Sequence, residues 1–513
     1  MEEFSSNQNI ESALEIKKSK IFSIVKNFFS KKDNLIIVGI LFFAFILRIY
    51  FFVIARTQPL WWDEACYGSL AKNILTSLWS DTDLIHSELI IRPPLFFLVW
   101  AALMLVKIPE SASRFILVVI PATFSVLFVY LISREVFNRR VAILSSLIFS
   151  VLWIHLFYSV RFLTDVPSLL FLFASIFFFI KANKQDFNYN LFTISLFLLS
   201  LSTLIRFING TLFFVYLLML FLSKNLLLNK KKFWISGLIG IFPILIFFIY
   251  NYISYQNIFP AFFGSDYLSP EETQNLPFAW SLLNYIPIYL QTTFFIFFII
   301  GILGVIFEIV VGYNLIVKNL KVRNYFLIMI ILIAIYSFFI FYMKVGDDRW
   351  LFIISLPLCC MAGLGIDYFY NFMKKYQKQF AIIIILVILI FGFYSQIIYA
   401  NNLINDRKIS FLQMRQGFEW IKENTPSESV IIGNGIQPYA VYYSERKYLD
   451  FPANESGKEI IEGADYLVMH GFTPQSDYMV DYIQENQNNW KPLAVLFFDE
   501  EQTQPALVIY ERI

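Results

Sequence analysis

The chain has 513 residues, of which 58% are hydrophobic and only 15% are charged, and its mean hydropathy is +0.63. Charged side chains this scarce cannot cover the surface of a soluble globular protein. The composition therefore excludes that class and predicts a polytopic membrane protein. The formal net charge of +2 excludes little, because the distribution of Lys and Arg among the loops is the informative quantity in a membrane protein.

Residues 1–33 are polar and lysine-rich, and the apolar run after them is too long for a signal peptide. We therefore expect a cytoplasmic N-terminal segment, followed at 34–399 by a membrane domain. Eleven apolar runs approach the ~20 residues that a helix needs to cross a bilayer. They cover residues 35–55, 112–132, 141–158, 166–181, 190–207, 209–223, 233–252, 286–311, 324–343, 351–370 and 380–399.

A twelfth run, at 93–106, begins with two prolines and is shorter, so it could cross, re-enter or lie at the interface. If it does not cross, five loops that carry fifteen basic and two acidic residues lie in the cytoplasm, as the positive-inside rule requires. If it crosses, these loops lie outside, and the loop 253–285, which has three acidic and no basic residues, lies inside. We therefore expect about eleven spans, an interfacial helix at 93–106 and an extracytoplasmic C-terminus.

With this topology the outer regions are the first loop, 56–111, and the segments 159–165, 253–285 and 344–350. From about residue 400 the composition becomes that of a soluble protein.

The spacing of apolar residues in this last part predicts a helix at 413–423, short strands at 429–433 and 464–469, and a strand pair at 493–498 and 506–510. Residues 400–513 are therefore expected to form a small extracytoplasmic α/β domain. Its nine basic and seventeen acidic residues argue against binding to nucleic acid or anionic lipid.

The cysteines and histidines indicate no metal or redox site. Cys66, Cys359 and Cys360 cannot form a disulfide framework, and we expect them to be small buried hydrophobic residues. His155 lies within an apolar run, so a hydrogen-bonded core histidine is the expected role.

Two adjacent carboxylates, Asp63 and Glu64, follow two tryptophans in the first outer loop. Residues 64–76 have the spacing of an amphipathic helix that would lie along the membrane surface. Asp63 would stand at the N-terminus of this helix, where backbone N–H groups and the helix dipole favour an ionised carboxylate. By itself this pattern fits a helix cap as well as an active site.

Other acids and arginines occur at the outer ends of the predicted spans. Asp165 and Arg161 lie in one outer turn, Arg349 follows two aspartates in another, and Arg92 precedes the interfacial helix. The planar fork of arginine suits a phosphate group, and a carboxylate beside it suits deprotonation of a hydroxyl. Each arginine alone fits a snorkelling boundary residue equally well.

These motifs follow one another along the chain in a recognisable order. They are Asp63-Glu64-Ala65, Arg92-Pro93-Pro94-Leu95, Ser113-Arg114-Phe115, Arg134 to Arg140, Tyr158 to Asp165 and Arg349-Trp350-Leu351. The order resembles that of the polytopic GT-C glycosyltransferases, in particular the protein O-mannosyltransferases and the aminoarabinose transferases. The resemblance covers roughly residues 30–370.

The resemblance implies a GT-C fold and an enzyme of the cell membrane that uses a dolichyl- or undecaprenyl-phosphate-linked sugar as donor. The acceptor would be a hydroxyl on a protein or on a lipid or glycan at the extracytoplasmic face. By the resemblance, Asp63 is the catalytic base of an inverting displacement, Glu64 assists by binding the acceptor or the sugar, and Asp165 orients the substrate.

Arg92 stands where the family often has Lys before Pro, and we expect it to act on the donor together with two further arginines. Arg92, Arg161 and Arg349 would hold the departing phosphate, where fixed positive charge is most effective. The sequence also departs from the aminoarabinose transferases, which carry an acid near their metal position. Ile90 and Ile91 stand there in this chain, so we expect no required metal or cofactor.

Two alternatives remain open. A multi-span transporter or lipid flippase would also have many spans and outward-facing charges. Transporters tend to place polar groups near mid-membrane and to show internal repeats, whereas the acids here lie at span ends. An inactive relative whose C-terminal domain binds a partner is the second alternative, and the presence of Asp63 argues against it.

Overall fold

The computed structural model describes residues 32–76, 92–224, 227, 229–256, 258, 277–315, 319–344 and 346–513. Nearly all of the predicted N-terminal segment, most of the predicted outer loop 253–285, and residues 77–91 of the first outer loop lie outside the described residues.

Within this part of the chain the molecule is mostly helical, and eight helices are long and apolar enough to cross a membrane. They are α2 (Lys32–Ala55), the continuous helix of α6 (Glu110–Arg114), η1 (Phe115–Val119) and α7 (Ile120–Val136), α10 (Asp165–Ala182), α13 (Lys231–Tyr255), η4 (Trp280–Asn284) with α15 (Tyr285–Val311), α16 (Leu320–Ser337) with η6 (Phe338–Met343), η7 (Asp348–Ile354) with α17 (Ser355–Met373), and α18 (Lys378–Arg407). The chain is therefore a multi-pass membrane protein.

All eleven predicted runs are helical, but three of them do not form one long helix. Two of them form helices of only 17 and 14 residues. These are α11 (Tyr189–Ile205) and α12 (Thr211–Lys224), and α12 follows the short 3-10 helix η2 (Phe207–Gly210). The run 141–158 was expected to be continuous, and this is wrong, because Leu152 leaves the helical conformation between α8 (Arg139–Val151) and α9 (Trp153–Tyr158). The backbone N–H of Trp153 instead donates to Gln396 Oε1 at 2.7 Å, which satisfies a donor that the break would leave unpaired.

The predicted helices of the first outer loop are both present. They are α3 (Trp62–Thr76) and α5 (Pro94–Leu105), and they pack on each other. The α5 helix begins with Pro94 in its first turn, where proline costs no hydrogen bond. The apolar spacing places Phe96, Phe97 and Trp100 in the core.

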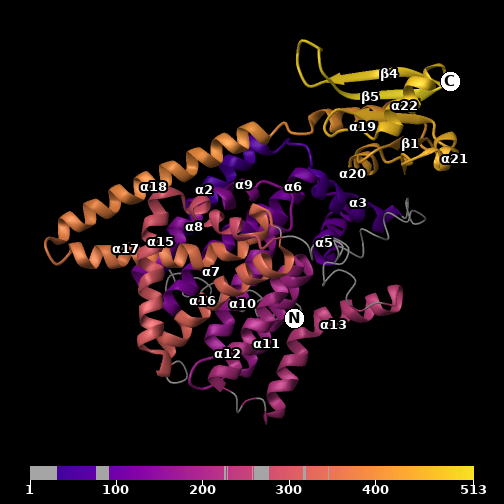
Figure 1. Cartoon of the computed structure of the whole chain (residues 1–513). Coiled ribbons are helices and arrows are strands. Elements are labelled where there is room, and N and C mark those ends of the chain that lie inside the picture. The colour runs from indigo at the N-terminus through magenta and orange to yellow at the C-terminus, as the bar shows by residue number, and fades with distance from the viewer. Residues whose placement is uncertain are drawn as a thin grey trace, which may run out of the picture.

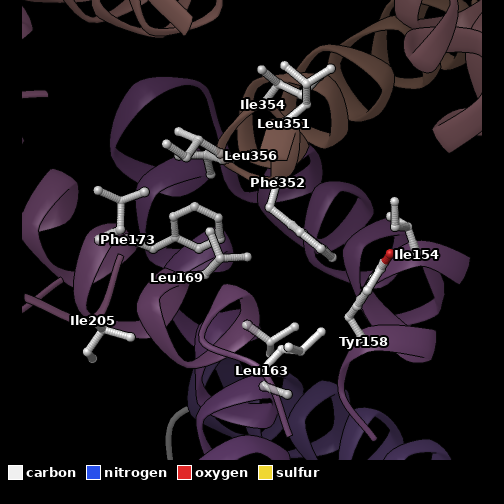
Figure 2. Packing of buried hydrophobic residues seen from close by; sticks show 14 of the residues in the cluster. Ile154, Tyr158, Leu163, Leu169, Phe173, Ile205, Leu351, Phe352, Ile354 and Leu356 are labelled. Atoms are coloured by element: carbon white, nitrogen blue, oxygen red, sulfur yellow. The ribbon is translucent and has the colours of Figure 1, made fainter. Parts of the chain in front are cut away.

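The membrane domain is built around α17, most of which is buried between its neighbours. In Figure 2, Leu163, Leu169 and Phe173 lie around the same core as Phe352 and Leu356. These residues come from the turn before α10, from α10 and from the η7–α17 helix, so the turns that carry the predicted site residues are anchored in one core.

Residues 346–513 are described without a gap, and their last part forms a small α/β domain. The elements are α19 (Leu412–Asn424), β1 (Val430–Gly433), α20 (Gln437–Tyr439), η8 (Ala440–Ser444), β2 (Lys447–Asp450), η9 (Glu455–Gly457), α21 (Lys458–Glu462), β3 (Tyr466–His470), α22 (Asp477–Glu485), η10 (Gln487–Asn489), β4 (Trp490–Phe497) and β5 (Pro505–Arg512). The strand order is β2-β1-β3-β5-β4, with β1 parallel to its two neighbours and β5 antiparallel to both of its own.

The predicted helix, the two buried strands and the final strand pair are confirmed, whereas β2 was not predicted. In Figure 1 this domain, drawn in orange to yellow, lies at one end of the helical domain, where α20 and η8 contact α3.

Candidate active site

The helix α3 presents a carboxylate to two arginines, one only 29 residues further along the chain and the other from a distant segment. Asp63 lies in the first turn of α3. Its Oδ1 accepts a hydrogen bond from Arg92 Nη2 at 3.1 Å, and its Oδ2 pairs with Arg349 Nη1 at 2.6 Å. The structure therefore brings together three of the six residues that the sequence predicts for the site.

The two arginines control the ionisation of Asp63. Burial of this carboxyl by itself raises its pKa, but the charges and hydrogen bonds of Arg92 and Arg349 outweigh burial. The pKa of Asp63 consequently lies below the ordinary value of an aspartate, because both arginines stabilise the charged form. Asp63 is therefore ionised at neutral pH.

Both arginines also have other partners, which limit their movement. The guanidinium carbon of Arg92 lies 5.1 Å from the centre of the Tyr67 ring, within the range of a cation–π contact. Arg349 Nε lies 3.5 Å from Asp347 Oδ2.

A second charged pair lies beside the first. Asp165 is buried at the N-terminus of α10, and its carboxylate pairs with Arg206. Arg206 occupies the extended residue between α11 and η2, and its Nη2 donates to the backbone oxygen of Arg349 at 3.3 Å. Arg206 was missed from the sequence, although a charged residue at the end of the run 190–207 was a signal for a functional position.

These groups line a cavity of about 840 Å³. Its polar lining includes Asp63, Arg92, Asp165, Arg206 and Arg349, which pair with one another and so gather in one part of it. The larger part of the lining is apolar and comes mainly from η2, α12, α13 and η6.

The apolar lining residues of this larger part are Phe207, Ile208, Phe213, Phe214, Ile241, Ile244, Leu245, Phe248, Phe338, Phe339 and Met343. The cavity therefore joins a cluster of three arginines and two aspartates to a larger apolar surface.

Two predicted site residues do not line this cavity. Glu64 and Arg161 are fully buried and pair at 2.5 Å. Glu64 also accepts hydrogen bonds from the backbone N–H groups of Trp61 and Phe162, and Arg161 Nη1 donates to Gln58 Oε1 at 2.9 Å.

The predicted roles of Glu64, in binding the acceptor or the sugar, and of Arg161, in holding the phosphate, stay predictions; in the structure the pair is fully buried and does not line the large cavity. The pair instead joins the start of α3 to the turn 159–162. Two adjacent carboxylates separate in this way because successive residues of a helix point about 100° apart.

A smaller cavity of about 330 Å³ lies between α3, α5 and the C-terminal domain. Its charged side chains already pair within the protein: Lys72 Nζ lies 2.7 Å from Glu445 Oε1, and the Tyr442 hydroxyl donates to Glu110 Oε2 at 2.9 Å. This cavity therefore lacks the cation cluster that distinguishes the larger one.

The cysteines and His155 have the structural roles expected of them. All three cysteines are free and buried. His155 is buried, with Arg48 Nη2 at 2.9 Å and Ser125 Oγ at 3.3 Å from its ring nitrogens. Within the described residues, no group of three or more His, Cys, Asp or Glu side chains is placed to hold a metal ion. That no metal is required remains a prediction.

Comparison with known proteins identifies what this arrangement resembles. Residues 91–250, less than half of the chain, match the family described as dolichyl-phosphate-mannose-protein mannosyltransferase. No curated protein sequence matches the chain.

Solved structures match over most of the chain. ArnT from Cupriavidus metallidurans, bound to undecaprenyl phosphate, has 12% sequence identity and a TM-score of 0.60, and the match covers 91% of this chain and 97% of that one. The Archaeoglobus fulgidus oligosaccharyltransferase tethered with an acceptor peptide has 13% identity and a TM-score of 0.62, with 85% of this chain and 69% of that one covered. At this identity the likeness shows the fold, and the predicted resemblance to GT-C glycosyltransferases is confirmed.

Proposed function

We propose that this protein is a membrane glycosyltransferase that moves a sugar from a polyprenyl-phosphate donor to an acceptor hydroxyl on a protein, lipid or glycan. The observation that carries the proposal is the position of Asp63, between two arginines in the charged part of a large and mostly apolar cavity. We further propose that the site lies at the extracytoplasmic face of the cell membrane, with the N-terminus in the cytoplasm and residues 400–513 outside.

The two kinds of lining match the two parts of such a donor. An isoprenoid chain from the bilayer can pack against the apolar wall without loss of an apolar environment, and a phosphate group is bound well by arginine. The structures with similar folds include ArnT bound to undecaprenyl phosphate and the archaeal oligosaccharyltransferase AglB in complex with a dolichol-phosphate, which supports a lipid phosphate as the ligand.

The reaction needs a base and a stabilised leaving group. The Asp63 carboxylate takes the proton of the acceptor hydroxyl while the hydroxyl oxygen attacks the anomeric carbon. The bond between that carbon and the phosphate oxygen breaks, and polyprenyl phosphate leaves with the electron pair, which inverts the configuration at the carbon. Arg92 and Arg349 stabilise the charge that develops on the phosphate, so no metal ion is required for this step.

Donor binding would also change the base. In the structure both arginines pair with Asp63, which makes this carboxylate a weak base. A phosphate that competes for the same two guanidinium groups weakens those pairs, so the pKa of Asp63 rises when the donor is bound. Asp165 would orient Arg206 toward the same phosphate, and the buried pair of Glu64 and Arg161 would hold the start of α3 in place.

The direct test uses the purified chain in vesicles that contain a polyprenyl-phosphate-linked sugar. The proposal predicts release of free polyprenyl phosphate and appearance of the sugar on an acceptor, both measured by mass spectrometry. Movement of the intact lipid-linked sugar across the bilayer without cleavage would instead support a flippase and contradict the proposal.

Arg349→Gln is expected to weaken binding of polyprenyl phosphate by about 10- to 100-fold, since a hydrogen bond to a charged group contributes about 1.5–3 kcal/mol. Affinity can be measured by titration of the solubilised protein with a short-chain polyprenyl phosphate. Arg407→Gln, at an exposed arginine at the end of α18, is the matched control and should bind normally. Equal affinity in both variants would remove Arg349 from the donor site.

The same variant should change the pH dependence of the reaction. In the wild-type enzyme the pKa of Asp63 is lowered, so activity that depends on its ionised form persists until the pH falls below the usual ~4 of an aspartate. Without Arg349, only Arg92 opposes the rise in the pKa of Asp63 that burial causes, so this pKa becomes higher. On acidification, Arg349→Gln should therefore lose activity at a higher pH than the wild-type enzyme. Profiles of kcat/KM against pH for Arg349→Gln and Arg407→Gln measure this difference, and identical acid limbs would contradict it.

A further inference from the structure

The C-terminal domain packs directly on the helix that carries Asp63. The contact is made by residues 438–445, which include the end of α20 and all of η8, and which we call the α3 clamp. The clamp contacts α3 from its first residue to Lys72: the Tyr439 ring lies 6.0 Å from the Trp62 ring, and Lys72 Nζ donates to the Tyr442 backbone oxygen at 2.7 Å. At 1.5 Å per residue, these contacts span about 15 Å of the helix.

The centre of the contact has no spare space. A Cβ atom on Gly68 would lie 2.4 Å from Tyr442 Cε2 and 2.9 Å from Trp100 Cη2. The backbone of α3 is therefore held between a ring of the C-terminal domain and a ring of α5, at a distance that only glycine permits. Tyr442 and Trp100 are both buried.

Hydrogen bonds and an ion pair also fix the position of α3 against the clamp. The backbone N–H of Leu60, just before α3, donates to the Tyr443 hydroxyl at 2.8 Å, and Ser69 Oγ donates to the Pro438 oxygen at 3.3 Å. Glu445 pairs with Lys72 at 2.7 Å.

We infer that the α3 clamp is a positioning element for the reaction: Tyr442 and Tyr443 hold the Asp63 helix at the right distance from Arg349, which stands on the membrane domain. The inference rests on the proposed function. The clamp residues do not line the large cavity, so they touch no substrate there and act through α3. This gives the C-terminal domain a role in catalysis although none of the clamp residues lines the cavity.

The variants Tyr442→Leu and Gly68→Ala test the inference from the two sides of the contact. The first removes the ring and the second pushes it away. Each should lower kcat about 10- to 100-fold, because a displacement near 1 Å of a reacting group has an effect of this size. Binding of polyprenyl phosphate should change less than about threefold, since Arg349 and Arg206 are not on α3.

Two further readouts separate positioning from a general loss of structure. The acid limb of kcat/KM should move to higher pH in both variants, because a displaced Asp63 loses part of its contact with the arginines. Hydrogen exchange of the backbone amides at 62–76 should become faster, while exchange in α17 stays unchanged. Gly39→Ala, where a Cβ atom meets nothing within 4 Å, and Tyr376→Leu, at an exposed ring, are the matched controls and should behave as wild type.

If either variant fails to fold, Tyr443→Phe replaces it, because this change removes only the acceptor for Leu60 N–H. Tyr443→Phe should lower kcat several-fold, and it should shift the acid limb and the exchange at 62–76 in the same directions. Wild-type kcat, acid limb and exchange at 62–76 in the folded variants would overturn the inference. The proposed function fails by a different result, an active Asp63→Asn enzyme, and the exchange measurement does not depend on activity.

Discussion

Asp63→Asn is expected to lower kcat for sugar transfer by about 10²- to 10⁴-fold, the range that a positioned general base contributes. The amide has nearly the same shape as the carboxylate but cannot accept the proton of the acceptor hydroxyl. Arg92 and Arg349 are thereby released to bind the donor phosphate, so affinity for polyprenyl phosphate should be retained or increased. Single-turnover transfer and donor titration on the same preparation measure the two effects.

The control for this variant is Asp477→Asn. Asp477 is an exposed acid in the first turn of α22, so it shares the helix position of Asp63 but lies outside the cavity. It should transfer sugar at the wild-type rate. Full activity in Asp63→Asn would refute both its role as the base and the proposed mechanism.

Arg161→Met is expected to destabilise the protein by about 3–5 kcal/mol, because it leaves the fully buried Glu64 carboxylate without its countercharge. The double variant Glu64→Leu/Arg161→Met should be less destabilised than Arg161→Met, since it removes both charges. Thermal unfolding of the detergent-solubilised variants tests this order.

The exposed pair of Lys321 and Glu308, at 2.9 Å, provides the comparison. Lys321→Met should cost no more than about 1 kcal/mol, as is usual for a surface ion pair. A stable Arg161→Met protein that no longer binds polyprenyl phosphate would contradict the structural role and restore the sequence-based assignment of Arg161 to the phosphate.

The sequence predicted the charged cluster because the membrane leaves few places for ionised groups. Acids and arginines that are excluded from the hydrocarbon gather at the ends of spans, and short outer turns keep them on one face. Asp63, Arg92 and Arg349 therefore meet in the structure as expected, although 286 positions separate the first from the last. The apolar runs predicted the presence of the helices equally well, because every backbone donor within a bilayer must be hydrogen-bonded inside the protein.

Other features depended on contacts between distant segments. The break at Leu152 is compatible with the core because Gln396 of α18 satisfies the freed donor of Trp153. The short strand β2 exists because its backbone pairs with β1. Neither pattern is visible in the local sequence.

By itself, the sequence predicted that this chain crosses a membrane, where most of its helices and its C-terminal α/β domain begin and end, and six candidate site residues, among them Asp63, Arg92 and Arg349. Hydrophobicity and charge are local properties, and the bilayer sorts them by position along the chain. The tertiary structure alone decided that Asp63 faces the cavity while Glu64 is buried with Arg161, that Arg206 joins the site, and that the C-terminal domain packs on α3. These depend on the rotation of each helix and on which surfaces meet, which are set by packing among segments hundreds of residues apart.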